Sequence, residues 1–198
     1  MEKKEDLLEN FKTAITSTIK SISNVDDLEV SFGNKISSSN KNTIRLPDID
    51  ILGKNIQYSK IRASADSEAL KIKHSNKIIF KSFQPKGSIS KRLYEIAEKI
   101  RYEKLGMLKY KGIGKNINTY YQERINNLEI EQNENKVLEA FENYLRVNIT
   151  NVKNSKKIEK KFNPLVKDFE KKFKKNLKLF KDLIFDQEKF NTLISNLI

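Results

Sequence analysis

Apolar residues recur at helical spacing in several separate stretches of the chain. Residues 4–23 carry the clearest stripe, formed by Leu7, Leu8, Phe11, Ala14, Ile15, Ile19 and Ile22. The same spacing predicts a helix over residues 57–73 and another that begins at Ser88, with Gly106 expected to end it in a left-handed conformation. Ala65 and Ala69 lie on the apolar face of the earlier helix, so we expect close packing against a neighbouring helix.

Two short segments instead alternate apolar with polar residues, which is typical of half-buried strands. They are Leu28–Phe32 and Thr43–Leu46, with a serine-rich loop over residues 33–42 between them and Pro47 after the second. We predict that the two strands pair antiparallel as a ribbon across the helices. The predicted fold class is mainly α with a small antiparallel β-ribbon (α+β), arranged as a helical bundle-like domain over residues 1–125.

Residues 126–198 are predicted to form a lysine-rich helical extension. One helix is expected over 137–145, a long one from Pro164 after an Asn163 cap, and a last one from Asp186 to Ile198. The long helix has a phenylalanine-rich stripe, for which a place in the core is favoured over an exposed partner site. The stripe consists of Val166, Phe169, Phe173, Leu177, Phe180 and Ile184.

Composition favours a helical, heavily solvated protein over a compact α/β enzyme, because 33% of the 198 residues are charged and only 37% are hydrophobic. The net charge of +13 comes almost entirely from lysine, since arginine occurs at six positions only: 45, 62, 92, 101, 124 and 146. Beyond Thr150, thirteen lysines face six acidic residues. Nucleic-acid sites favour arginine forks and interleaved aromatic residues, so nucleic acid is the less favoured partner.

Several kinds of chemistry are disfavoured by the residues present. The chain has no cysteine and one histidine, which excludes disulfides and thiolate catalysis and argues against a protein-only zinc site. The Asp48-Ile-Asp50 pair is more typical of a solvated turn than of a divalent cation site. No segment approaches the roughly 18 apolar residues of a membrane span, and no signal peptide is evident, so we expect a cytoplasmic protein without membrane contact.

Two further candidates have alternatives that must be weighed. Gly112-Ile-Gly114-Lys115 resembles part of a phosphate loop, but Lys109 and Asn116 occupy the positions where a Walker motif needs glycine and a hydroxyl. Glu98, Arg101 and Glu103, spaced E-x-x-R-x-E on the polar side of a helix, could be solvated decoration or a charge network. We predict a structural or partner-facing network without acid–base catalysis.

The segment E-K-I-R-Y-E-K-L-G from Glu98 to Gly106, with Gly112-Ile113 and Asn116-Ile117 after it, resembles the amino-terminal region of the T subunit of the aerobic cobaltochelatase (CobT). A second signature of that family is similar to Arg62, Asp66, Ala69-Leu70 and His74. The resemblance defines a partner or structural signature and assigns no catalytic, cofactor or metal residue. Its members are Arg62, Asp66, His74, Glu98, Arg101, Glu103, Gly106, Gly112 and Asn116.

What the resemblance implies is a role in a complex. Family members belong to an ATP-dependent machine that inserts cobalt into hydrogenobyrinic acid a,c-diamide during aerobic cobalamin synthesis. In it a large subunit holds the ring and an AAA+ subunit hydrolyses ATP. The implied partners are these two subunits, and ATP, magnesium and cobalt are used by the complex with no cofactor in this chain. The family's von Willebrand A domain, with its D-x-S-x-S metal site, is absent, so we expect a truncated relative or a fragment. The alternative function is a lysine-rich protein that binds nucleic acid or acidic surfaces.

Overall fold

The computed structural model describes residues 2–33, 43–49, 58–127 and 134–198, and helices dominate this part of the chain. In chain order the elements are α1 (Glu2–Ser23), β1 (Glu29–Phe32), β2 (Thr43–Leu46), α2 (Tyr58–His74), α3 (Lys77–Ser82), α4 (Ser88–Lys109), α5 (Lys111–Asn126), α6 (Glu134–Leu145), the π-helical turn η1 (Arg146–Thr150), α7 (Lys156–Phe173), the 3-10 turn η2 (Lys174–Asn176), α8 (Leu177–Asp182), the 3-10 turn η3 (Leu183–Phe185) and α9 (Gln187–Leu197).

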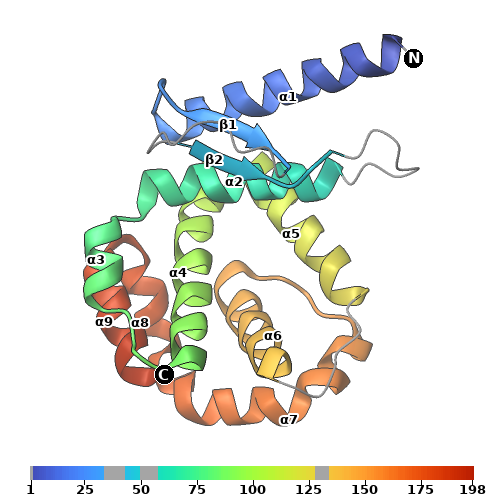
Figure 1. Cartoon of the computed structure of the whole chain (residues 1–198). Coiled ribbons are helices and arrows are strands. Elements are labelled where there is room, and N and C mark those ends of the chain that lie inside the picture. Colours follow the sequence, from blue (N-terminus) through green and yellow to red (C-terminus); the bar gives the residue numbers. More distant parts are fainter. Residues whose placement is uncertain (1, 34–42, 50–57, 128–133) are drawn as a thin grey trace.

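Helix α4 runs through the middle of the molecule (Figure 1). Helix α2 crosses one end of α4, with the two strands and α1 stacked beyond it. Helices α3, α8 and α9 lie on one side of α4, and α5, α6 and α7 lie on the other. The central position of α4 means that its side chains meet neighbours from most parts of the chain.

The two strands form a parallel pair, so the prediction of an antiparallel ribbon was wrong. Glu29 pairs with Thr43 and Phe32 with Leu46. The length of the intervening segment explains the difference. Ten residues, 33–42, separate the strands; this is longer than the two to five residues that close most hairpins, and it can extend about 33 Å, well over the length of a four-residue strand. The chain can therefore return to the start of the pair before β2 begins.

Two apolar clusters meet along α4. Its amino-terminal half contributes Leu93, Tyr94, Ala97 and Ile100 to a cluster with α6, η1, α7, α8 and α9. Its carboxyl-terminal half contributes Tyr102 to a second cluster with α1, the strands, α2 and α5. The first cluster contains residues from both sides of the predicted division at residue 125, a division that stays a prediction. Helix α4 therefore ties the two cores together.

Several helix interiors agree with the sequence patterns. Ala65 and Ala69 are buried in the cluster that contains α1 and Tyr102, which confirms the expected close packing. The phenylalanine-rich stripe is core, since Phe173 and Phe180 are fully buried. Asp186 begins the last helix as predicted, and its side chain accepts a hydrogen bond from the backbone N–H of Lys189.

Two helix ends were predicted wrongly. Helix α4 continues through Gly106 to Lys109. Helix α7 begins after Ser155, whose hydroxyl accepts from the backbone N–H of Ile158, so Pro164 lies inside the helix and does not start it. Pro164 is exposed, so its ring lies on the solvent side of α7, away from the core. The predicted loop over 34–42, Asp50 of the aspartate pair and the predicted helix start at Gln57 lie outside the described residues.

Candidate functional site

The signature residues on α4 lie at the boundary between the two cores, where Glu98 and Arg101 form a buried ion pair. The Arg101 guanidinium donates to both carboxylate oxygens of Glu98, from Nε at 2.7 Å and from Nη2 at 2.9 Å. Arg101 is 1% exposed and Glu98 3%. Because they are one helical turn apart, their side chains lie side by side on α4. Solvated decoration is therefore excluded for this pair.

The same pair connects three other segments to α4. Arg101 donates to the backbone carbonyls of His74, at the end of α2, and of Ile184, in η3, the latter at 3.3 Å. Glu98 accepts from the Ser75 hydroxyl at 2.6 Å and from the Gln187 amide at 3.0 Å. The four hydrogen bonds that Arg101 donates use all three nitrogens of the guanidinium, a geometry that a lysine ammonium cannot reproduce. The pair therefore fixes α2, η3 and α9 relative to α4.

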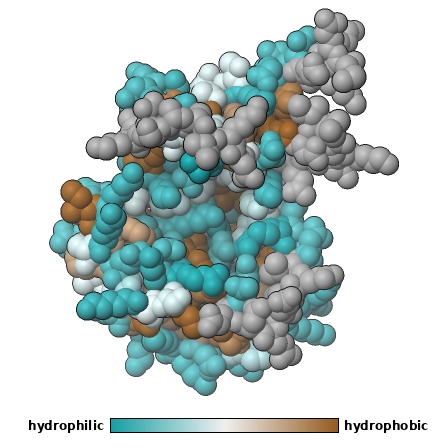
Figure 2. Space-filling view, viewed as in Figure 1, coloured by the Kyte–Doolittle hydropathy of each residue, from teal (hydrophilic) through white to brown (hydrophobic). Residues whose placement is uncertain are grey.

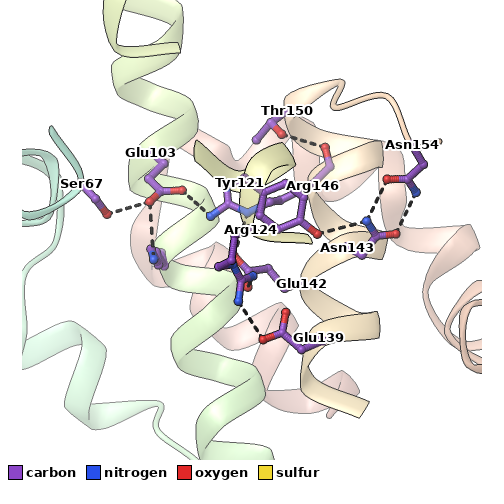
Figure 3. A network of polar contacts seen from close by, with 11 residues as sticks. Ser67, Glu103, Tyr121, Arg124, Glu139, Glu142, Asn143, Arg146, Thr150 and Asn154 are labelled. Atoms are coloured by element: carbon purple, nitrogen blue, oxygen red, sulfur yellow. Dashed lines mark hydrogen bonds and ion pairs between the residues drawn. The ribbon is translucent and has the colours of Figure 1, made fainter. Parts of the chain in front are cut away.

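Glu103, the third charged signature residue on α4, belongs to a separate network (Figure 3). It accepts from Arg146 Nη2 at 2.8 Å and from the Ser67 hydroxyl at 2.7 Å. Lys99 adds a longer contact of 3.9 Å at its more exposed side. Glu103 thus joins α2 and η1 to α4. The predicted charge network exists, but as two networks, with Glu98–Arg101 on one side and Glu103–Arg146 on the other.

Arg146 extends this second network to α5 and α6. Its Nε donates to Glu142 at 2.8 Å, and the other oxygen of Glu142 accepts from Arg124 at 2.6 Å. Arg124 also pairs with Glu139 at 2.8 Å. Burial alone would raise the pKa of Glu142, but Arg146 and Arg124 outweigh burial and lower it from 4.5 to about 2. Glu142 is therefore ionised across the ordinary pH range.

Tyr121 of α5 lies against both arginines of this network. The Arg146 guanidinium is 4.7 Å from the ring centroid and that of Arg124 is 5.4 Å from it. The phenol oxygen accepts from the Asn143 amide at 3.1 Å, and Asn143 and Asn154 exchange two amide hydrogen bonds of 2.9 Å. Burial and the Glu142 charge raise the pKa of Tyr121, so the phenol stays neutral. The ring acts as a packing surface for the buried Arg146 and the partly exposed Arg124.

A π-helical turn at the end of α6 begins at Arg146. Residues 146–150 form this turn, and Asn151 then takes a left-handed conformation with φ 59°. The Thr150 hydroxyl donates to the Arg146 carbonyl at 2.8 Å, so this backbone acceptor has a side-chain partner. A π-turn inserts an extra residue into the helical repeat, so it rotates side chains relative to an α-helix. Here Arg146 faces Glu103 and Glu142 together.

Asp66 and Asn116 come together although 50 residues separate them in sequence. The Asn116 amide donates to the Asp66 carboxylate at 2.9 Å, linking α2 to α5. Burial raises the pKa of Asp66, against the opposing effects of Asn116 and Arg62. Arg62 itself is exposed, and its guanidinium lies 5.9 Å from the Phe11 ring centroid on α1. The Asp66–Asn116 bond therefore adds a third polar link between helices.

Gly106 marks the closest approach of α2 to α4. A Cβ at this position would lie 2.3 Å from Leu70 Cδ1 and 2.9 Å from Leu70 Cγ. Leu70 is fully buried and has little room to move. Gly106 is therefore required by packing against Leu70, and the left-handed helix end expected from the sequence is not its role. Gly112 differs, because its Cβ would meet no atom within 4 Å.

The backbone carbonyl of His74, and not its imidazole ring, accepts the hydrogen bond from Arg101. Ring atom Nε2 is buried and has no hydrogen-bond partner. Burial lowers the pKa of His74, and the charges of Lys73, Arg101 and Lys109 lower it further. The ring is therefore neutral at physiological pH. Among the described residues, no carboxylate or hydroxyl forms a hydrogen bond with Nε2.

Sequence reasoning missed the residues that complete these networks. They are Arg124, Glu139, Glu142, Arg146, Tyr121, Asn143, Asn154 and Gln187. The arginine list held the available signal, because a chain that uses lysine almost everywhere retains arginine where a planar fork is needed. Arg101, Arg124 and Arg146 all lie in these networks.

The side chains of these networks join helices to one another more than they offer free groups for catalysis. Within the part of the chain that the structure describes, no group of three histidine, cysteine or acidic side chains is placed to hold a metal ion. Among the same residues, no helix is long and apolar enough to cross a bilayer. The buried carboxylates and guanidiniums are bonded to one another and to backbone carbonyls. The signature residues therefore stabilise the relative positions of the helices.

Within the described residues, these contacts define a class of protein: a mainly helical scaffold with a short parallel strand pair, whose helices are joined by buried arginine–glutamate pairs. The family model described as "Cobalamin biosynthesis protein CobT" matches residues 5–198, nearly the whole chain. The chain belongs to this family and takes part in cobalamin biosynthesis. No solved structure matches it.

Proposed function

We propose that this chain is a non-catalytic assembly subunit, or a fragment of one, of an ATP-dependent cobaltochelatase. In this proposal the complex inserts cobalt into hydrogenobyrinic acid a,c-diamide during aerobic cobalamin synthesis, in the cytoplasm. An AAA+ subunit hydrolyses ATP, a large subunit holds the ring, and this chain joins the AAA+ subunit to the assembly. The observation that carries the proposal is the family match over residues 5–198.

The geometry of the signature residues supports a scaffold role. An acid–base or metal-binding residue must present a free polar atom to substrate. Glu98, Arg101 and Glu103 instead direct their polar atoms at other segments of the same chain. Residues whose polar atoms are bonded within the chain stabilise its shape. A stable shape is what an assembly subunit presents to its partners.

A binding experiment tests this proposal. The full chain, carrying an affinity tag, is mixed with the cognate AAA+ subunit at about 0.15 M salt and again at about 0.5 M salt, where the Debye length is well below roughly 8 Å. We expect retention at both concentrations, because docking through apolar surface survives screening. An unrelated AAA+ ATPase serves as the control.

A reconstitution experiment tests the function itself. Cobalt insertion is followed by the absorbance of the tetrapyrrole with the large subunit, the AAA+ subunit and this chain present. Omitting this chain should abolish insertion, while the chain alone should neither hydrolyse ATP nor insert cobalt. Full insertion without the chain, or ATP hydrolysis by the purified chain, would contradict the proposal.

The exposed lysines of α7 and α8 favour one alternative, a protein that binds nucleic acid or acidic surfaces. Lys160, Lys167, Lys171, Lys174 and Lys178 recur at helical spacing opposite the buried Phe162 and Phe173, and all five are exposed. Nucleic-acid binding would weaken log-linearly with salt through counterion release. Tight DNA binding at about 0.15 M salt that is lost at about 0.5 M salt, without AAA+ binding, would favour this alternative.

A further inference from the structure

Two large apolar side chains are more exposed than the rest of the fold requires. Ile78, in the first turn of α3, is 80% exposed, and Phe185, at the end of η3, is 74% exposed. In the space-filling view, hydrophobic side chains gather at the left edge of the molecule over α3 (Figure 2). Exposing an apolar residue of this size to water is less favourable than burying it. Such positions are candidates for contact with a partner.

A hydrogen-bonded clamp links the two segments that carry these side chains. The Gln187 amide oxygen accepts from the backbone N–H of Asn76 at 2.7 Å, and its Nε2 donates to the Asn76 carbonyl at 3.2 Å. The Asn76 side chain in turn accepts from the backbone N–H of Ile78 at 2.8 Å. Phe185 lies two residues before Gln187.

The clamp limits the separation of Ile78 and Phe185. Each lies two residues from one end of the Asn76–Gln187 contact, so their Cα atoms are within about 20 Å of each other. A standard interface buries about 800 Å² on each partner, an area about 30 Å across. That separation is shorter than the width of one interface footprint, and the clamp limits it before any partner binds.

Lysines without acidic partners border the same surface. Lys104 lies one turn after Arg101 on α4, and Lys181 lies one turn before Ile184, whose carbonyl accepts from Arg101. Burial lowers the pKa of Lys104, and the nearby Lys181 charge lowers it further. The ion pairs found among the described residues involve neither of these lysines. Two neighbouring like charges without an acidic partner favour a carboxylate supplied from outside.

Acidic groups on this side of the molecule compensate only part of the positive charge. Asp186 is already paired with Lys189 at 2.9 Å. Asp182 and Glu188 are exposed, and Lys77 next to Ile78 adds a further cation. The surface made of Ile78, Phe185, Lys77, Lys104 and Lys181, which we call the α3–η3 surface, is therefore apolar in its anchors and positive at its rim.

We propose that the α3–η3 surface docks an acidic segment of the AAA+ chelatase subunit, with Ile78 and Phe185 as the apolar anchors and Lys104 and Lys181 as carboxylate partners. This inference rests on the proposed function, because it names the surface through which that assembly forms. Charge complementarity selects the chemistry of the segment, since a partner carboxylate relieves the repulsion between two ammonium groups. A polypeptide also covers Ile78 and Phe185, which a phosphodiester backbone leaves in water.

The test compares variants of the full chain in a binding titration with the cognate AAA+ subunit. Ile78→Ala combined with Phe185→Ala should weaken binding about tenfold or more, because truncating central apolar anchors removes the contacts that dominate interface affinity. Leu7→Ala is the matched control, since Leu7 is 69% exposed on α1, away from this surface, and should leave binding unchanged. Circular dichroism melting of each variant verifies that the fold is retained.

The outcomes separate the surface from the function. If the parent chain binds the AAA+ subunit and the double variant binds equally well, the α3–η3 surface is the wrong one and the proposed function stands. If the parent chain does not bind, both proposals fall. A second arm replaces Lys104 and Lys181 with Gln, which should weaken binding and reduce its salt dependence. An unchanged salt dependence would overturn the acidic character of the segment.

The chain alone provides a further check on the occupant. Sedimentation of the parent chain should show a monomer at the concentrations of the titration. A dimer that the Ile78→Ala/Phe185→Ala variant converts to a monomer would overturn the proposal, because the surface would then belong to a second copy of this chain. Duplex DNA binding that the same double variant abolishes would overturn it as well.

Discussion

The interior around α4 and the outer face of α7 and α8 carry the same sign of charge in two different ways. Around α4 the cations are arginines, of which Arg101 and Arg146 are buried and Arg124 is 28% exposed, and all three are bonded to carboxylates at 2.6–2.8 Å. On α7 and α8 the cations are exposed lysines, and the pair between Lys171 and Asp168 is 3.4 Å long with both side chains largely in solvent. The molecule therefore has one set of charges that stabilises its fold and another set that is solvated.

The difference follows from the physics of desolvation. A buried ion pair is stable only when specific bonds offset the free energy lost on leaving water. The planar guanidinium satisfies several acceptors at fixed angles, which is why Arg101 can hold Glu98 and two carbonyls together. A surface lysine has no such requirement, and its pairs contribute about 0–1 kcal/mol.

Removing the Arg101 side chain should cause the largest loss of stability. Arg101→Ala leaves Glu98 buried without its cation and releases the carbonyls of His74 and Ile184. We expect a loss of about 3–5 kcal/mol in the free energy of unfolding, measured by urea denaturation. Arg101→Lys should recover only part of this, because one ammonium cannot replace the fork.

Arg92 provides the matched control on the same helix. It is exposed and donates to Asn135 at 3.2 Å. Arg92→Ala should change the free energy of unfolding by no more than about 0.5 kcal/mol. Equal effects of the two substitutions would break the distinction between interior and surface cations.

Acid should weaken the interior network through Glu142. The pKa of Glu142 in the folded chain is about 2, below its ordinary value of 4.5, because Arg146 and Arg124 outweigh the effect of burial. The ionised form therefore favours the folded state. This contribution, about 3 kcal/mol, is fully present above about pH 4.5 and is lost as the pH falls towards 2. Urea denaturation at a series of pH values measures it.

Glu142→Gln isolates this group from the other carboxylates. The variant should be less stable than the parent chain at pH 7, and the gap should close below about pH 4.5. A gap that stays constant down to pH 2 would show that Glu142 keeps an ordinary pKa in the folded chain.

Two glycines of the same signature allow a tightly packed position to be compared with an open one. Gly106→Ala places a Cβ against the fully buried Leu70, and we expect a loss of about 1–3 kcal/mol despite the gain in helix propensity. Gly112→Ala meets no neighbour within 4 Å in an exposed first turn of α5, so it should be neutral or stabilise by up to about 1 kcal/mol. Thermal melting followed by circular dichroism measures both.

The Leu70→Ala background checks the cause of the Gly106 effect. Leu70→Ala removes the atoms that the new Cβ would meet, so adding Gly106→Ala to it should be much less harmful than in the parent chain. Additive losses would mean that backbone strain, and not contact with Leu70, explains the need for glycine.

The sequence predicted those features that depend on local spacing. Helical periodicity located α1 and α4, and the three-residue spacing of Glu98 and Arg101 indicated their pairing. Features that depend on distant segments were missed, because no local pattern encodes them. Glu103 finds Arg146 43 residues away. From the sequence, Gly106 was expected to end a helix. Only the contact with Leu70 shows that it is needed for packing.

The predictions of the strand direction and of the start of α7 were wrong for the same reason. Both pairings of β1 and β2 bury the same alternating residues, so periodicity could not choose between them. Asn163-Pro164 has the composition of a helix start, yet the Ser155 cap begins the helix eight residues earlier. The scarcity of arginine was a signal that the sequence analysis did not use, although three of the six arginines, Arg101, Arg124 and Arg146, lie in these networks.

The smallest effect is expected on the lysine face of α7. A double-mutant cycle of Lys171→Ala and Asp168→Ala should give a coupling free energy of no more than about 0.5 kcal/mol at 0.15 M salt, because water screens two exposed side chains. The same cycle for Arg146 and Glu103, both buried and 2.8 Å apart, should give several times that value and change little between 0.15 M and 1 M salt. Urea denaturation of the four proteins in each cycle supplies the numbers. Similar couplings in the two cycles would mean that burial does not separate these cations, and the arginines around α4 would then need another explanation.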